Sequence, residues 1–115
     1  MKKAINSTIL WKLHRLMIEE KIDFKKWFQD EQMTLEAIPV SIYEIMKVLP
    51  RQITLGVNAV GIEEFFRLSI YWQSDILGWY VGYQGSRWLS VKRELELVDA
   101  LGKLLIWAIQ EGWLG

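Results

Sequence analysis

The side chains best suited to acid–base or metal chemistry are few and scattered in this sequence. His14 is the single histidine, and the chain has no cysteine. The absence of cysteine excludes thiolate zinc sites, iron–sulfur clusters, disulfides and cysteine nucleophiles. One histidine cannot complete a usual transition-metal site, so we expect His14 to be a solvated surface residue. We also expect no metal and no other cofactor.

The carboxylates and serines form no catalytic pattern. Adjacent acids on a helix point about 100° apart, and three such pairs occur, Glu19-Glu20, Asp30-Glu31 and Glu63-Glu64. Glu96 and Asp99 are three residues apart, but helical periodicity predicts that both lie on an exposed side. No serine has a G-x-S-x-G setting, and Gly78, Gly82 and Gly85 are spaced too widely for a phosphate-binding loop. We therefore expect no enzymatic activity.

Aromatic and arginine side chains are the remaining candidates for function, and binding is the chemistry that suits them. The stretch FRLSIYWQSDILGWYVGY (66–83) contains five aromatic residues after Phe66. Its alternation predicts two strands, each with an apolar side facing a core and a mixed side facing away. Tyrosine and arginine are enriched at protein interfaces. The predicted partner-binding residues lie on or beside the mixed side and are Arg67, Ser69, Tyr71, Gln73, Tyr80, Arg87 and Trp88.

Other interpretations of this mixed side stay open. An antiparallel sheet can be wet on one face, and a shallow aromatic face could also carry a small ligand. Single-strand nucleic-acid binders combine aromatic rings with a basic groove, and Lys92 and Arg93 add positive charge here. However, Glu94, Glu96 and Asp99 are close in sequence, and the 14 basic and 14 acidic residues of the chain cancel. Nucleic acid is therefore not expected as the sole direct partner.

The elements that must position these residues follow from the periodicity of the apolar side chains. In chain order, the pattern predicts helices over 7–21, 23–28 and 42–49, strands over 53–57, 66–73, 77–83 and 88–91, and a helix from about Glu94 to Glu111. Asn6 or Ser7 caps the first helix, and Ser41 with Glu44 forms a capping-box pattern before the third.

The last helix should pack across one face of the sheet. Its apolar stripe is Leu97, Leu101, Leu104, Leu105 and Ala108. Gly102 costs about 1 kcal/mol relative to alanine in mid-helix, so we expect it to mark a close approach of the helix to the sheet. Gly112 occupies the position of a left-handed C-cap residue.

Together these elements predict one α+β domain over residues 1–115. Residues 1–48 form its helical N-terminal part, and residues 49–115 form a sheet and a closing helix. The sheet is expected to be a small antiparallel meander of three to four strands, with the long C-terminal helix packed on one face. Whether the N-terminal helices pack on the sheet or form a separate arm stays open.

Composition and charge indicate a globular protein of the cytoplasm. Apolar residues make up 51% of the 115-residue chain and charged residues 24%. The longest uninterrupted apolar run, residues 104–109, is too short to span a membrane. Charged residues follow Lys2-Lys3 too soon for a signal peptide, so we expect a cytoplasmic protein without a membrane partner.

Four motifs in the C-terminal two-thirds occur in a characteristic order. They are a Leu-Pro start at Leu49-Pro50 with Ile53, LSIYW (68–72), GWYVGY (78–83) and VDALGKLLIWAIQEGWL (98–114). This order resembles small uncharacterised proteins of bacteriophages and prophages, in which two short aromatic strands precede a closing helix of ALxxxLIWxIExG type. Gln110 replaces the acid that is frequent there. The resemblance covers about residues 49–114 and carries over no functional residues.

The resemblance implies binding. Our leading hypothesis is a non-enzymatic phage-type protein that binds and blocks a bacterial host protein in the host cytoplasm, with anti-CRISPR-like inhibition of host defence as one form. The alternative is a self-associating structural or accessory module of a phage or mobile element, present as a homodimer. A weak nucleic-acid-binding protein is the second alternative.

Overall fold

The chain folds as the α+β arrangement that the sequence predicts. The computed structural model describes residues 5–23, 41–57, 60–75 and 77–113. Their elements are α1 (Ser7–Glu19), α3 (Ile42–Val48), β1 (Gln52–Val57), β2 (Glu63–Gln73), β3 (Gly78–Gln84), β4 (Trp88–Glu94) and α4 (Leu97–Gln110). The helix expected over 23–28 falls largely outside the described residues. None of the helices in the described ranges has the length and apolar character needed to cross a membrane.

The four strands form an antiparallel meander in the order β1-β2-β3-β4. In the β2–β3 hairpin, Leu68 pairs with Tyr83 and Ile70 with Val81, so the two apolar sides share one face as predicted. β4 continues to Glu94, three residues beyond the expected end of this strand. Because β4 occupies those residues, α4 begins at Leu97 instead of near Glu94.

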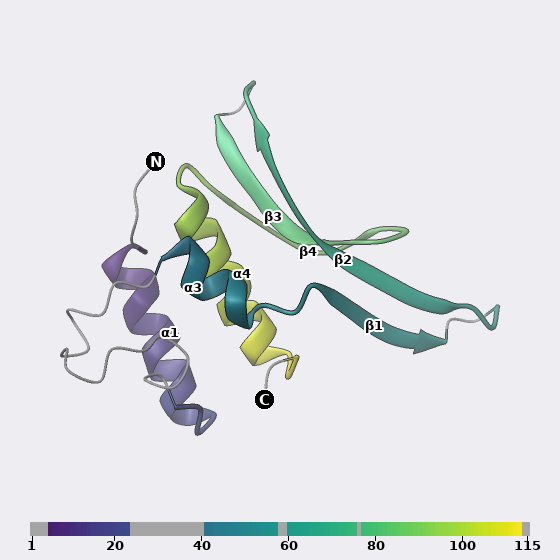
Figure 1. Ribbon diagram of the computed structural model, residues 1–115, viewed down its shortest axis with the longest axis horizontal. Coiled ribbons are helices and arrows are strands. Elements are labelled where there is room, and N and C mark those ends of the chain that lie inside the picture. The colour runs from purple at the N-terminus through teal and green to yellow at the C-terminus, as the bar shows by residue number, and fades with distance from the viewer. Residues whose placement is uncertain (1–4, 24–40, 58–59, 76, 114–115) are drawn as a thin grey trace.

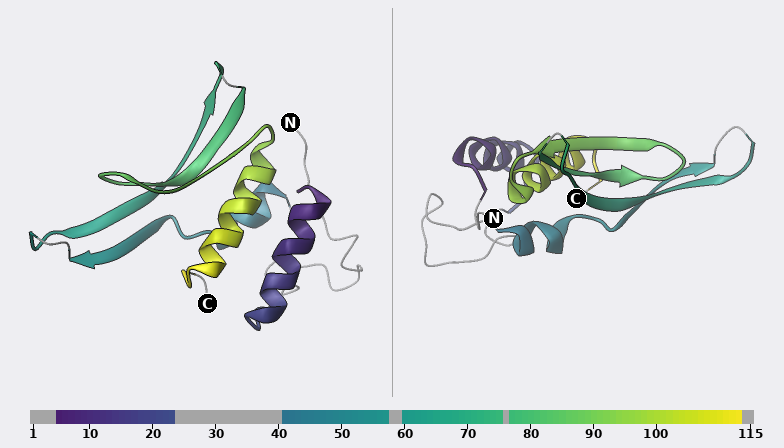
Figure 2. Two further views of the ribbon diagram at one scale, coloured as in Figure 1. Left: turned by 180° about the vertical axis from the view of Figure 1, so that it is seen from behind. Right: turned by 90° about the horizontal axis from the view of Figure 1, so that it is seen from above.

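All the described helices lie on one side of the sheet. Figure 1 and Figure 2 show α4 between the sheet and α1, and α3 also packs against α4. The described helices of the N-terminal part therefore rest on the closing helix and form no separate arm. The opposite face of the sheet, which we call the open face, is covered by no described helix.

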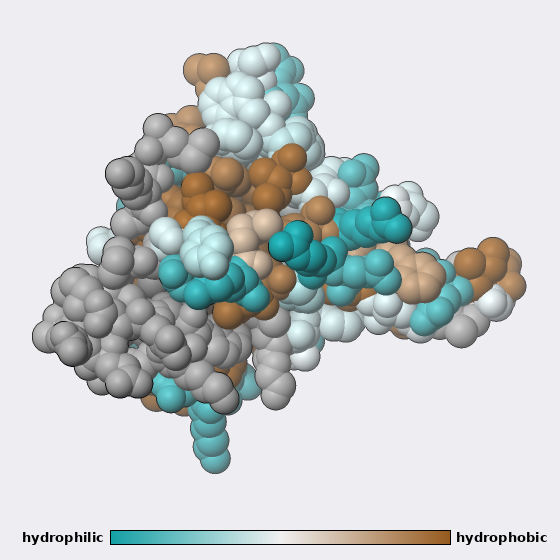
Figure 3. Space-filling view, viewed as in Figure 1, coloured by the Kyte–Doolittle hydropathy of each residue, from teal (hydrophilic) through white to brown (hydrophobic). Residues whose placement is uncertain are grey.

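The core surrounds α4 and lies between the sheet face that α4 covers and the helices α1 and α3. Phe66, Val81 and Tyr83 are fully buried there, and all five residues of the predicted α4 stripe are buried. On the same face Ile70 and Trp72 are 37% and 44% exposed, because the tip of the β2–β3 hairpin rises beyond α4 (Figure 1). Figure 3 shows apolar side chains gathered between α3 and this tip.

The N-terminus of α1 packs on α4 in a way that corrects two expectations. Asp99 is buried, at 7% exposed, and its Oδ1 accepts a hydrogen bond from the Asn6 N–H at 2.7 Å. The prediction of an exposed Asp99 was wrong because α1 covers that side of α4. Gly102 does mark a close approach, but to α1 and the residues just before it: a Cβ at this position would overlap Ile5 Cδ1 and would lie 3.0 Å from Ile9 Cγ2.

The helix caps agree with the sequence patterns. Asn6, the first of the two candidates, caps α1, and its side chain accepts a hydrogen bond from the Thr8 N–H at 2.8 Å. Ser41 Oγ accepts the Glu44 N–H at the start of α3. Gly112 adopts φ +78 after α4, and the Trp113 N–H bonds back to the Ala108 carbonyl. This left-handed cap is the one that the glycine predicts.

Candidate functional site

The open face of the sheet carries most of the predicted binding residues. Cross-strand partners share a face, and Tyr71 pairs with Tyr80, which pairs with Arg93. The side chains on the open face belong to Phe65, Arg67, Ser69, Tyr71, Gln73, Tyr80, Gln84, Trp88, Val91 and Arg93. Six of the seven residues predicted from the sequence, all except Arg87, therefore lie on this face. The β2–β3 hairpin and β4 bring them together.

Three aromatic rings from three strands form a contiguous cluster at the centre of the open face. The rings of Tyr71 and Tyr80 stack with their centroids 5.2 Å apart and their planes 6° from parallel. The Trp88 ring lies 5.8 Å from Tyr71 and is tilted by 44°. Tyr71 is 39% exposed, and the other two rings are half-buried. We call Tyr71, Tyr80 and Trp88 the aromatic cluster.

Two glycines of β3 allow side chains to lie flat against the open face. A Cβ at Gly82 would meet the Ser90 carbonyl oxygen at 2.0 Å and Trp88 Cε3 at 3.1 Å. A Cβ at Gly78 would lie 2.8 Å from Arg93 Nε. The Trp88 ring and the Arg93 guanidinium therefore occupy the space that side chains at these two positions would fill. Rings held in this way lose little further conformational freedom on binding, which favours recognition.

The polar predicted residues flank the cluster along β2. Arg67 is exposed, and Ser69 is half-buried, with its hydroxyl donating to the Arg67 carbonyl at 3.3 Å. Gln73 lies at the end of the strand, paired with Gly78. This arrangement of aromatic rings beside arginine and neutral polar groups is typical of protein interfaces.

Arg87 lies away from the other predicted residues. Its guanidinium is 3.7 Å from a Glu64 carboxylate oxygen and 5.2 Å from the centroid of the Phe66 ring. Phe66 belongs to the covered face, so Arg87 reaches around the sheet to that side. The sequence pattern could not place Arg87, because it falls in the β3–β4 connection, where alternation stops.

Four residues of the open face were missing from the predicted set, namely Phe65, Gln84, Val91 and Arg93. Phe65 is 48% exposed and precedes Arg67 by two positions on the same strand, so extending the alternation by one step would have found it. Arg93 was considered only as part of a basic patch. Its place beside Tyr80 depends on β4 continuing to Glu94, a length that the sequence pattern did not predict.

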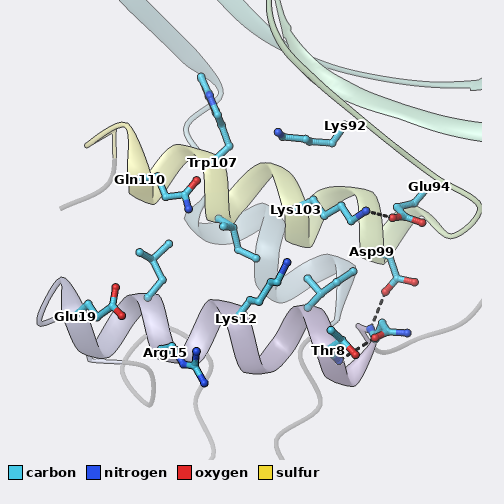
Figure 4. Close-up of a pocket in the computed structure, with 14 residues that line it drawn as sticks. Thr8, Lys12, Arg15, Glu19, Lys92, Glu94, Asp99, Lys103, Trp107 and Gln110 are labelled. Atoms are coloured by element: carbon cyan, nitrogen blue, oxygen red, sulfur yellow. Dashed lines mark hydrogen bonds and ion pairs between the residues drawn. The ribbon is translucent and has the colours of Figure 1, made fainter.

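A groove of about 710 Å³ lies on the other side of the molecule, between α1, α4 and β4 (Figure 4). Its floor includes Ile106 and Trp107, and Lys12 is directed from α1 toward α4. Lys103 forms an ion pair with Glu94 across the groove. Four basic and three acidic side chains line the groove, so it carries little net charge.

The side chains that could bind a metal ion are dispersed over the described part of the chain. No three His, Cys, Asp or Glu side chains among them are close enough together to hold a metal ion. His14 is half-buried beside Trp11, whose ring lies edge-on at 6.0 Å, so it is less solvated than we expected. What the described geometry offers is a surface of three aromatic rings in contact.

Sequence comparison adds no family to this description. The phage resemblance therefore stays a prediction. The chain matches no protein-family model, and the searches of curated proteins and of solved structures likewise give no match.

Proposed function

We propose that this protein is a non-enzymatic binding module that recognises another protein through the open face of its sheet. The aromatic cluster is the observation that carries the proposal. Three rings from β2, β3 and β4 lie in contact on a face that no described helix covers, and the exposed Arg67 lies on the same face. Clustered Tyr, Trp and Arg side chains supply most of the free energy at typical protein interfaces.

The more specific form of the proposal is inhibition of a bacterial host protein, with host defence machinery as one target class. Its support is the resemblance of residues 49–114 to small phage proteins. A blocking protein needs affinity and a rigid surface but no catalytic group, and the aromatic cluster with its two glycine positions supplies a surface of that kind.

The test compares wild-type protein with a double variant, Tyr71→Ala with Tyr80→Ala, in affinity capture from bacterial lysate. Hot-spot residues cost about 2 kcal/mol or more each when truncated, so the double variant should lose its captured protein almost completely. Tyr43→Ala is the matched control, because Tyr43 is a 68% exposed tyrosine on α3, away from the open face. This control should capture the same protein as the wild type.

Two further readouts make the result decisive. Circular dichroism of the double variant must show the wild-type helix and strand content, so that lost capture reports on the surface. Capture should persist when the salt concentration is raised, whereas nucleic-acid binding falls steeply with salt. If the folded double variant captures the same protein in the same amount, the open face is not the binding surface.

A further inference from the structure

The strand β2 is longer than its neighbour β1, which leaves part of its edge unpaired. β1 pairs with residues 63–67 of β2, and the last bond on that side runs from the Leu68 N–H to the Arg51 carbonyl at 2.9 Å. Within the described part of the chain, residues 69–73 are paired with β3 on their other side only. We call residues 69–73 the open edge.

The backbone groups that point outward from the open edge can be identified. Backbone N–H and C=O groups alternate in direction along a strand. Because the Leu68 N–H points toward β1, those of Ile70 and Trp72 point in the same direction, where β1 has ended. Ser69, Tyr71 and Gln73 direct theirs toward β3, with which they are in register. Two outward donors and two outward acceptors are thus available to another strand.

The open edge also lacks the features that normally keep strand edges apart. Residues 68–74, LSIYWQS, contain no charged residue, proline or glycine, and such uncharged edges readily pair with further strands. Ile70, Tyr71 and Trp72 are 37%, 39% and 44% exposed. By contrast, the outer strand β4 carries Lys92, Arg93 and Glu94, and β1 has a register irregularity between Thr54 and Gly56.

We propose that the open edge pairs with the open edge of a second copy of this chain, antiparallel about a two-fold axis at Tyr71. This register matches all five open residues of each copy, with Ser69 opposite Gln73 and Ile70 opposite Trp72. Ile70 and Trp72 would exchange both backbone hydrogen bonds with their counterparts, as opposed residues do in an antiparallel pair. On the covered face Ile70 then meets Trp72 of the second copy. On the open face Tyr71 meets Tyr71 of the second copy.

Charge complementarity at the two ends supports the same register and a second copy as the occupant. The turn after β2 carries Asp75, and about an axis at Tyr71 this turn comes next to the start of β1 in the other copy. Asp75 therefore approaches the end of the partner edge where the exposed Arg51 and Arg67 lie. Each copy contributes one such end, so the two-fold arrangement brings opposite charges together twice.

This inference goes beyond the proposed function, because it concerns an edge of the sheet and not its open face. It makes the functional unit a homodimer in which the two sheets are continuous. The two aromatic clusters would then lie on one face, adjacent across the axis, because the two-fold axis that relates two antiparallel edge strands stands perpendicular to the sheet.

The absence of native cysteine allows a sharp test. Tyr71→Cys places two cysteines opposite each other with Cα atoms about 4.5 Å apart, within the range of about 4.4–6.8 Å that disulfides span. Under mild oxidation most of this variant should run as a disulfide-linked dimer. Ser69→Cys is the matched control, since its two copies lie four residues out of register, about 13 Å apart, and it should stay largely uncrosslinked.

A second measurement follows the mass in solution. Light scattering should give twice the 13.6 kDa chain mass for the wild type. Ile70→Pro removes one outward N–H and should give the single-chain mass, whereas Ile70→Thr keeps that N–H and should remain dimeric. A single-chain mass for the wild type at every concentration, or equal crosslinking at positions 69 and 71, would overturn the proposal. Neither readout requires the captured protein, so the dimer and the proposed function are tested separately.

Discussion

Tyr83 joins two parts of the core through one side chain. Its ring is fully buried on the covered face and lies 5.8 Å from Trp107 of α4. Its hydroxyl donates a hydrogen bond to the Pro50 carbonyl at 2.7 Å, where the chain leaves α3 for β1. The residue therefore ties β3 to the helix layer by packing and to the α3–β1 connection by a hydrogen bond.

Replacing Tyr83 by phenylalanine should destabilise the fold while leaving the ring packing intact. The Pro50 carbonyl would lose its partner, which costs about 1–3 kcal/mol of unfolding free energy. Urea denaturation followed by fluorescence measures the change. Tyr43→Phe serves as the control because Tyr43 is 68% exposed, and surface changes of this kind usually stay within about 0.5 kcal/mol. Equal stability of both variants and the wild type would show that the hydrogen bond contributes nothing.

Tyr83 should also make stability depend on pH in the alkaline range. Burial raises the pKa of Tyr83 well above its ordinary value, because the charged phenolate is poorly solvated in the core. At pH values below the ordinary tyrosine pKa of about 10, the protonated Tyr83 makes its full contribution to the free energy of unfolding. As pH rises past that value the unfolded chain loses this proton while the folded chain keeps it, so stability declines. The difference in unfolding free energy between the wild type and Tyr83→Phe should become smaller as the pH rises from about 9 to about 11.

At the scale of elements, the contact between α1 and α4 depends on a buried carboxylate. Asp99 accepts the Asn6 N–H, and Asn6 in turn caps α1 through the Thr8 N–H. Asp99→Ala would leave a donor at the start of α1 without its acceptor, and we expect a loss of about 1–3 kcal/mol. Asp99→Asn keeps a carbonyl oxygen at the same place, so its loss of unfolding free energy should be clearly smaller than that of Asp99→Ala. Hydrogen exchange should show faster exchange of the first turn of α1 in the alanine variant alone.

Sequence patterns predicted the elements because each element depends on its near neighbours. Alternation predicted the β2–β3 hairpin and placed Tyr71 and Tyr80 on the same side of it, where the structure pairs them. The positions of Asp99 and Gly102 depend on contacts with Asn6 and Ile5, which are more than 90 residues away in sequence. No local pattern reports on such contacts, so both residues were interpreted incorrectly.

The candidate site shows the same limit. Tyr71, Tyr80 and Trp88 were predicted together, and the structure brings their rings into contact. Arg87 was grouped with them by sequence proximity alone, yet it interacts with Glu64 and Phe66 near the covered face. Arg87 precedes β4, in a connection where the period of two does not apply, and only the completed fold decides to which side of the sheet it turns.

At the scale of the whole molecule, α4 holds the described parts together. It contacts the sheet on one side and α1 and α3 on the other, and ten of its fourteen residues are buried. The sheet and α1 make their main described contacts with α4 and not with each other (Figure 2). A weakened α4 should therefore weaken both parts at once.

Leu101→Ala tests this dependence because Leu101 is fully buried in α4. Removing a buried leucine side chain costs about 2–5 kcal/mol, and the loss should appear equally in both flanking parts. Hydrogen exchange read on peptides from α1 and from the β2–β3 hairpin should show the same decrease in protection. Gln110→Ala, at an exposed position of the same helix, should change neither. If the hairpin kept its protection while α1 lost it, the sheet would be stable without α4, and the fold would consist of two units that unfold independently.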